Sequence, residues 1–404
     1  MRKLDRGWRW GIGGLALAGA ASGVYFWLRP ASLWSGLDQG GSYAPVEIQH
    51  PVQGACLPRN LPSPVVLWKP GLGGVGRWAV GIEAGGRRWL FADIEPRWQP
   101  PGVAWRQMTG AAGGRPIRLV LAGYESGRRG RLLARASVSF AVAPEAVEWP
   151  LFYREVNLPF KEAVKDPSHI RWRFGTVAQG LPPVVLGNLP VCGNCHSFSS
   201  NGEFLAMDVD YANDKGSYII TRTGGDMRLA TSDIITWDDF RREDGQHTLG
   251  LLSQISPDGR YVVSTVKDLS IFMAKPELAF SQLFFPFLGI LAVYDRDTKQ
   301  FASLPGADDP ALVQSNPTWS PDGQWIVFAR TRAVPVKDVR SPGRILLSGA
   351  EGEAFLQQTK EYRYDLYRVP FNGGKGGKAE PLRGASANGR SNYFPKYSDR
   401  KSVV

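Results

Sequence analysis

Hydrophobic and polar residues alternate in short runs over most of the chain, and clusters of glycine and proline separate these runs. In the region 36–150, such runs fall at 65–69, 78–83, 89–93, 117–121 and 134–141. Runs of this length and spacing predict the strands of an all-β sandwich. We expect Trp68, Trp78, Trp89 and Trp98 to pack in or beside its core rather than to bind a ligand.

A second pattern covers 151–404 and repeats a tight turn that leads into a strand. SPDGRYVV at 256–263 recurs as SPDGQWIV at 320–327, and SSNGEFLA at 199–206 is a weaker copy. The first serines of the three copies are 57 and 64 residues apart. This period suits four-stranded blades of a β-propeller with insertions. Three full blades and the start of a fourth are visible.

The end of the chain departs from this repeat. After Ser398 the repeat predicts Pro-Asp-Gly, but the sequence reads DRKSVV at 399–404. Because propellers close with four to eight blades, we interpret these six residues as the end of a truncated reading frame, with a natural terminus as the alternative.

The first 35 residues carry the signature of a membrane segment. Arg2, Lys3, Arg6 and Arg9 precede an apolar run of 18 residues at 11–28. As a helix this run is about 27 Å long, enough for a bilayer core. We predict an inner-membrane anchor with a cytoplasmic N-terminus and a periplasmic bulk. Small residues at 18–20 leave removal as a signal peptide open.

Composition is that of a globular chain, with 404 residues of which 43% are hydrophobic and 21% charged. The net charge of +11 favours an anionic membrane surface or an acidic redox partner, since export argues against nucleic acid. The chain has three cysteines, which are too few for a disulfide framework. We expect the isolated Cys56 to pack as a small buried residue.

The string Cys192-Gly193-Asn194-Cys195-His196 carries the most specific chemistry. Its C-x-x-C-H spacing lets Cys192 and Cys195 form thioethers with one haem while His196 binds the iron. A structural zinc site needs four ligands, and the remaining histidines are scattered without zinc spacing. The motif therefore predicts one covalent haem c.

Other haem contacts are less specific. Met207 is the best candidate for the distal iron ligand, although a strand methionine is more often a core residue. Met227, His169 and His247 are weaker alternatives. Arg171 and Arg173 precede the motif and could pair with the haem propionates, unless they are simply solvated.

An oxygen-rich cluster, Asp208, Asp210, Asn213 and Asp214, follows the motif. Calcium favours such ligands, but Ala212 stands where a calcium loop needs its third ligand. We interpret these side chains as stabilising turns.

Several strings resemble a known family: LFYREV at 151–156, VCGNCHSF at 191–198, MDVD at 207–210, NDKG at 213–216, GADDP at 306–310 and SNYFPK at 391–396. They are similar to a bacterial family of exported TolB-like β-propellers with a single C-x-x-C-H motif. The resemblance covers about 151–398 and extends more loosely to the sandwich, for which it implies a fibronectin III-like or immunoglobulin-like fold.

These observations predict a membrane-anchored periplasmic monohaem protein that transfers electrons to or from a redox partner protein. A haem-dependent redox enzyme acting on a small nitrogen or oxygen compound is the first alternative. A binding or sensor protein is the second. The sequence contains no P-loop, H-E-x-x-H or Ser-His-Asp order.

Overall fold

The computed structural model describes residues 43–69, 73–126, 130–157, 165–189, 191–227, 229–250, 252–274, 282–334, 345–358 and 362–397. The predicted anchor at 1–35 and the predicted truncated end at 399–404 lie outside these residues. None of the helices in the described part is long and apolar enough to span a membrane. The chain divides into two compact units, Met1–Phe152 with Phe174–Pro183, and Tyr153–Arg173 with Val184–Val404.

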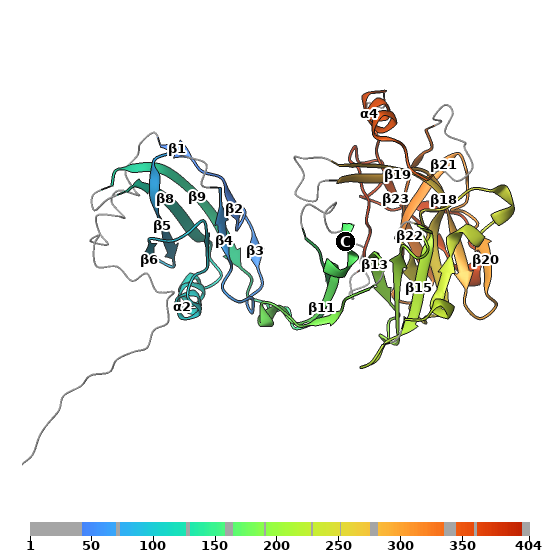
Figure 1. Cartoon of the computed structure of the whole chain (residues 1–404), viewed down its shortest axis with the longest axis horizontal. Coiled ribbons are helices and arrows are strands. Elements are labelled where there is room, and N and C mark those ends of the chain that lie inside the picture. The colour runs from blue at the N-terminus through green and yellow to red at the C-terminus, as the bar shows by residue number, and fades with distance from the viewer. Residues whose placement is uncertain are drawn as a thin grey trace, which may run out of the picture. The chain divides into compact units, whose positions relative to one another are not determined.

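In the residues that the structure describes, the first unit contains two sheets and helix α2 (Gly102–Ala112) (Figure 1). Each predicted run contains a strand. The larger sheet has the order β1-β9-β8-β5-β6, with β3 also paired to β9, and the smaller has the order β2-β4-β7. Their bounds are β1 Ala44–Pro45, β2 Ile48–His50, β3 Cys56–Leu57, β4 Val66–Trp68, β5 Val75–Ala84, β6 Arg87–Ala92, β7 Arg97–Trp98, β8 Ile117–Glu125 and β9 Leu132–Val142.

The two sheets share one core, as the alternating pattern predicts. Trp68 and Trp78 are buried in it and meet edge to face with ring centroids 5.5 Å apart. Trp89 and Trp98 are half-buried against the same core. One expectation for this unit is wrong: Cys56 is exposed in β3 rather than buried. Leu57, the other residue of this strand, is buried, so the alternation of side chains along the strand turns Cys56 to solvent.

Helix α2 (Gly102–Ala112) belongs to the same core and was not predicted from the sequence. Trp105, Met108 and Ala112 recur at helical spacing and are its buried residues. The indole of Trp105 stacks on Phe140 of β9 at 6.3 Å, and its Nε1 donates to the Leu61 carbonyl. The helix is short and rich in glycine and β-branched residues, so its propensity is weak and packing stabilises it.

Three four-stranded antiparallel sheets form most of the second unit, and each is built from consecutive strands as propeller blades are (Figure 1). The first has β13 Gly193–Phe198, β14 Phe204–Val209, β15 Ser217–Arg222 and β16 Ile234–Thr236. The second has β17 Gln254–Ile255, β18 Tyr261–Ala274, β19 Gln282–Asp295 and β20 Gln300–Ser303. The third has β21 Leu312–Trp319, β22 Trp325–Arg332, β23 Asp365–Pro370 and β24 Glu380–Pro381.

A three-stranded sheet precedes these blades and consists of β10 (Leu151–Glu155), β11 (Arg171–Gly175) and β12 (Val184–Leu186). A second helix, α4 (Gly349–Gln358), packs beside the long β18–β19 hairpin through Phe355 and Phe287. Facing blades interlock through apolar side chains. Tyr218 and Ile220 meet Val262 and Val266 between the first and second blades.

The repeated turn has the same hydrogen bonds in all three blades, including the weaker copy. Ser256 Oγ accepts from the Tyr261 backbone N–H at 2.8 Å, and the Ser320 and Ser199 hydroxyls do the same for Trp325 and Phe204 at 2.9 and 3.0 Å. Each serine also donates to the Asp or Asn two residues later. A glycine with positive φ then closes each turn.

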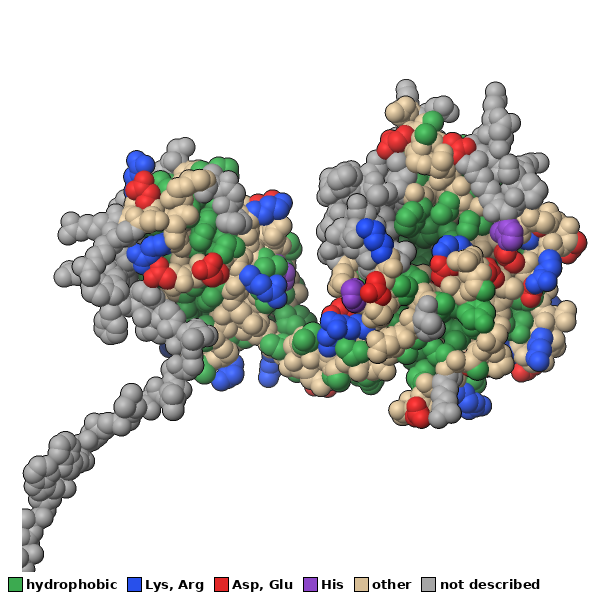
Figure 2. All heavy atoms as spheres, in the orientation of Figure 1, with side chains coloured by type: hydrophobic (Ala, Val, Ile, Leu, Met, Phe, Trp, Pro, Cys, Tyr) green, Lys and Arg blue, Asp and Glu red, His purple; other side chains and the backbone are tan. Residues whose placement is uncertain are grey.

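Charged side chains of both signs are interspersed over the face of the molecule in Figure 2, where blue and red spheres alternate on both units. Many of them are paired at the surface, such as Arg260 with Asp295 at 2.8 Å. Exposed pairs of this kind contribute little to stability.

Replacement of Trp105 by alanine should destabilise the first unit by about 3–5 kcal/mol, because it removes a buried indole and leaves a cavity between α2 and β9. Urea denaturation followed by far-ultraviolet circular dichroism measures this change. Trp149→Ala is the matched control, since Trp149 is 77% exposed and its loss should cost almost nothing. Equal effects of the two substitutions would contradict the placement of α2 in the core.

Candidate functional site

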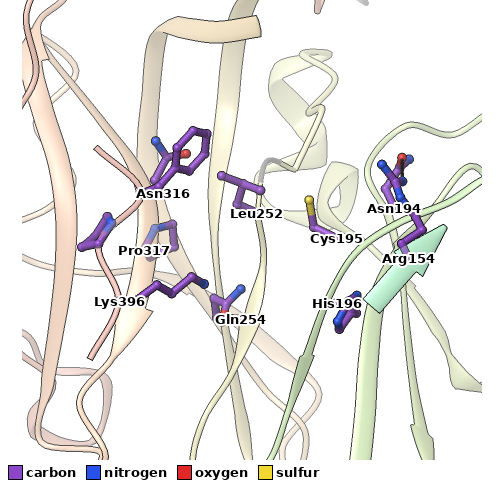
Figure 3. Close-up of a pocket in the computed structure, with 11 residues that line it drawn as sticks. Arg154, Asn194, Cys195, His196, Leu252, Gln254, Asn316, Pro317 and Lys396 are labelled. Atoms are coloured by element: carbon purple, nitrogen blue, oxygen red, sulfur yellow. Dashed lines mark hydrogen bonds between the residues drawn. The ribbon is translucent and has the colours of Figure 1, made fainter. Parts of the chain in front are cut away.

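A cavity of about 350 Å³ is lined by residues of the first strands of the three blades, β13, β17 and β21, and of segments beside them (Figure 3). A volume of this size is typical of sites for small molecules and cofactors. Both Cys195 and His196 line it, so the motif opens onto the cavity. The other lining residues are Arg154, Asn194, Leu252, Gln254, Asn316, Pro317, Phe394, Pro395 and Lys396.

The repeat itself builds this cavity. Counted from the turn serine, Cys195, Leu252 and Asn316 occupy the same position, four residues before Ser199, Ser256 and Ser320. Phe394 stands four residues before Ser398, which begins the next copy. Four successive repeats therefore contribute one equivalent residue each to the lining, and the first repeat contributes a cysteine followed by a histidine.

Backbone strain concentrates at the same position. Leu252, Asn316 and Phe394 have φ values of 56°, 54° and 55°, in the left-handed region. A left-handed conformation is unfavourable for large side chains such as leucine and phenylalanine, so the surrounding structure must hold it. Residues held in this way cluster at functional sites, which supports the cavity as the site of this unit.

The two cysteines of the motif are placed differently. Cys195 lies in β13 and its Sγ points into the space beside Leu252 (Figure 3). Cys192 precedes the strand, is 9% exposed and has its Sγ 3.9 Å from Asn194 Oδ1. Burial raises the pKa of both thiols, that of Cys195 to about 12 with help from the nearby Asp208. Both are therefore thiols at neutral pH.

Arg154 of β10 hydrogen-bonds the two residues between the cysteines. The sequence did not identify it as a site residue. Its Nη1 donates to the Gly193 carbonyl at 2.9 Å and to Asn194 Oδ1 at 2.6 Å. Charge-assisted bonds of this kind are stronger than neutral ones. Its place in the LFYREV string was the only available signal, and nothing in that string identified its partners.

Gly193 lets the motif pack against the three-stranded sheet. A Cβ at this position would lie 2.5 Å from the ring of Trp172, closer than real side chains approach. Trp172 of β11 is fully buried. The motif therefore lies between Trp172 on one side and Arg154 on another, which fixes its path into β13.

Arg171 and Arg173, predicted as propionate partners, both bind Glu155 in the structure. Arg171 Nη2 is 2.5 Å from Glu155 Oε1, and Arg173 bonds the other carboxylate oxygen. The hydrogen bonds from Arg173 and then Arg171 lower the pKa of Glu155. Neither arginine lines the cavity. Arg154 and Lys396 are the cationic residues that do.

Met207 lies next to His196 rather than opposite it. The two are register partners on the adjacent strands β14 and β13, so their side chains leave the same face of the sheet. Met207 is fully buried. A haem between these two side chains would have to part the two strands. The weaker alternatives are not cavity residues: His169 is 3.5 Å from Asp166, and His247 bonds Asp238 at the surface.

The oxygen-rich cluster does not converge on one point. Asp210 pairs with Lys215, and Asp214 Oδ1 accepts from the Gly216 N–H at 2.9 Å. Asp208 is half-buried near Cys195 and bonds Ser253, and desolvation of its carboxyl group raises its pKa well above the usual range. In the described part of the chain, no three His, Cys, Asp or Glu side chains are grouped to hold a metal ion.

Lys396 enters the cavity from the fourth repeat. It lies across the cavity from β13 and extends toward Gln254 and His196 (Figure 3). The residue as a whole is exposed, but partial desolvation at the cavity lowers the pKa of its amine, and the nearby Cys195 acts in the opposite direction.

The sequence matches no family model and no curated protein. Solved structures that it matches include TolB from Acinetobacter baumannii, with 12% identity, TM-score 0.34 and coverage of 82% of this chain and 59% of that chain. The Dos1 propeller has 10% identity and a TM-score of 0.32, and the match covers 71% of this chain and 62% of that chain. The tricorn protease has 10% identity and a TM-score of 0.30, and the match covers 78% of this chain and 34% of that chain. This chain spans less than two thirds of the length of each of them.

The three thiols should differ in reactivity in the haem-free protein. At pH 8 a thiol of pKa 12 has a thiolate fraction on the order of 10⁻⁴, so Cys195 should resist iodoacetamide, while the exposed Cys56 reacts. Peptide mass spectrometry before and after denaturation measures each site. Rapid alkylation of Cys195 in the folded protein would contradict its burial.

Proposed function

We propose that the protein is a monohaem c protein of the exported TolB-like propeller type and that it acts in electron transfer. The observation that carries this proposal is the position of Cys195 and His196. They occupy two neighbouring repeat positions that line a cavity shared by four repeats: Cys195 is equivalent to Leu252, Asn316 and Phe394, and His196 to Pro317 and Pro395. A C-x-x-C-H string that only packed as a strand would have no reason to lie there.

The residues around the cavity fit a haem with one adjustment. Cys195 and His196 already face the space, and Leu252, Pro317 and Phe394 offer apolar surface to a macrocycle. Cys192 must turn away from Asn194 to form the second thioether. Haem iron, when bound, carries single electrons by cycling between its ferrous and ferric states.

The chain's own groups would tune such a centre. His196 would be the proximal ligand, and Arg154 would hold the Gly193-Asn194 spacer so that both cysteines keep their spacing. The apolar residues would limit water at the iron, which favours electron transfer over the binding of exogenous molecules.

Location and partner follow from the sequence and form part of the same proposal. The segment 1–35 would anchor the protein in the inner membrane with its bulk in the periplasm. The net charge of +11 suits an acidic redox partner, whose encounter it would accelerate.

Covalent haem should survive denaturing electrophoresis when the protein is exported together with a haem c maturation system. Cys192→Ala with Cys195→Ala should abolish the haem stain, because no thioether can form. Cys56→Ala is the matched control and should keep the full stain, since Cys56 belongs to the other unit. Haem that stays covalently bound to the double variant would refute the assignment.

The anchor should keep the full chain in the membrane fraction through a high-salt wash, which removes proteins held by charge alone. A variant lacking 1–35 behind a cleavable export signal should appear in the soluble periplasmic fraction. Release of the full chain by salt would instead indicate attachment by its positive charge.

A further inference from the structure

We propose that Lys396 is the distal ligand of the haem iron, opposite His196. This inference rests on the proposed haem function and adds the group that completes the iron's coordination. The sequence favoured Met207, in β14 of the first blade, as the distal ligand. We assign this role instead to a residue of the fourth repeat.

Few of the residues that line the cavity have a side chain that can bind iron as the distal ligand. An iron ligand needs a lone pair on nitrogen or sulfur that is free to face the metal. His196 takes the proximal position, and Cys195 becomes a thioether on the haem edge. Arginine stays protonated in proteins and cannot ligate, which removes Arg154. The amine of Lys396 is the remaining basic nitrogen among the lining residues.

The positions of the two residues also suit trans coordination. Axial ligands must approach a flat macrocycle from opposite faces. His196 lies in β13, whereas Lys396 lies in the irregular segment 391–396 on the other side of the cavity, whose volume is about 350 Å³ (Figure 3). Met207 leaves the same sheet face as His196, one strand away, and is closed in by Trp172 and Gly193.

Lys396 differs in chemistry from the residues at the equivalent position of the other repeats. Its equivalents, two residues before the turn serine, are Ser197, Gln254 and Thr318. Ser197 bonds the buried Tyr218, so these positions hold short polar side chains within the structure. A lysine at this position brings a long basic side chain to the cavity in one repeat only. Paired binding of a haem propionate is the competing role for its charge.

Lys396→Arg separates the two roles, because arginine keeps the positive charge but has no lone pair to give to iron. With Lys396 as ligand, the ferric full-length protein is six-coordinate and low-spin, and Lys396→Arg becomes high-spin and gains binding of carbon monoxide when reduced. Electron paramagnetic resonance and visible spectra measure both changes. Lys375→Arg, at an exposed lysine that does not line the cavity, should keep the wild-type spectra.

Lys396→Ala provides a second test if the arginine variant does not fold. Added methylamine should restore its low-spin spectrum by replacing the lost amine in the cavity. A low-spin Lys396→Arg protein, a low-spin Lys396→Ala protein without amine, or a wild-type protein that is already high-spin would each overturn the ligand assignment while leaving covalent haem intact. Absence of covalent haem from the wild-type protein would instead overturn the proposed function itself.

Discussion

One hydrogen-bonded turn per repeat sets the geometry on which the site depends. Its serine hydroxyl binds the backbone N–H five residues later and the Asp or Asn two residues later, in all three blades. These bonds fix the register between the first and second strands of each blade. Because the register is the same each time, residues four positions before the serine face the same cavity. A shift of one residue would turn Cys195 away from it.

The C-x-x-C-H motif thus places reactive side chains at repeat positions that unreactive residues occupy in the other repeats. Other repeats place Leu252, Asn316 and Phe394 there at the cost of left-handed backbone. Around the motif, Gly193 admits Trp172, and Arg154 binds the spacer. Two hydrogen-bonded pairs are buried near it: Tyr218 bonds Ser197, and Trp237 bonds Ser253. Such satisfied networks rigidify a site, which a redox centre requires.

Local patterns and tertiary partners differ in how far they can be predicted. The strand runs of the first unit and the three turns were correct, because alternation and turn residues act within a few positions. Helix α2 was missed, since its weak propensity is overridden only by packing of Trp105 on Phe140. The exposure of Cys56 and the pairing of Arg171 and Arg173 with Glu155 likewise depend on neighbours that are distant in the sequence.

By itself, the sequence determined the strands, the repeat and the residues of the motif, because periodicity and spacing are properties of contiguous residues. Only the tertiary structure decided which side chains share the cavity. Arg154, Leu252, Asn316 and Lys396 come from separate elements and meet at the motif through blade packing. Met207 was plausible along the chain but lies beside His196 on one sheet face. A second iron ligand must lie on the side of the cavity opposite His196. The number of residues between two side chains in the sequence does not show whether they face each other in the fold.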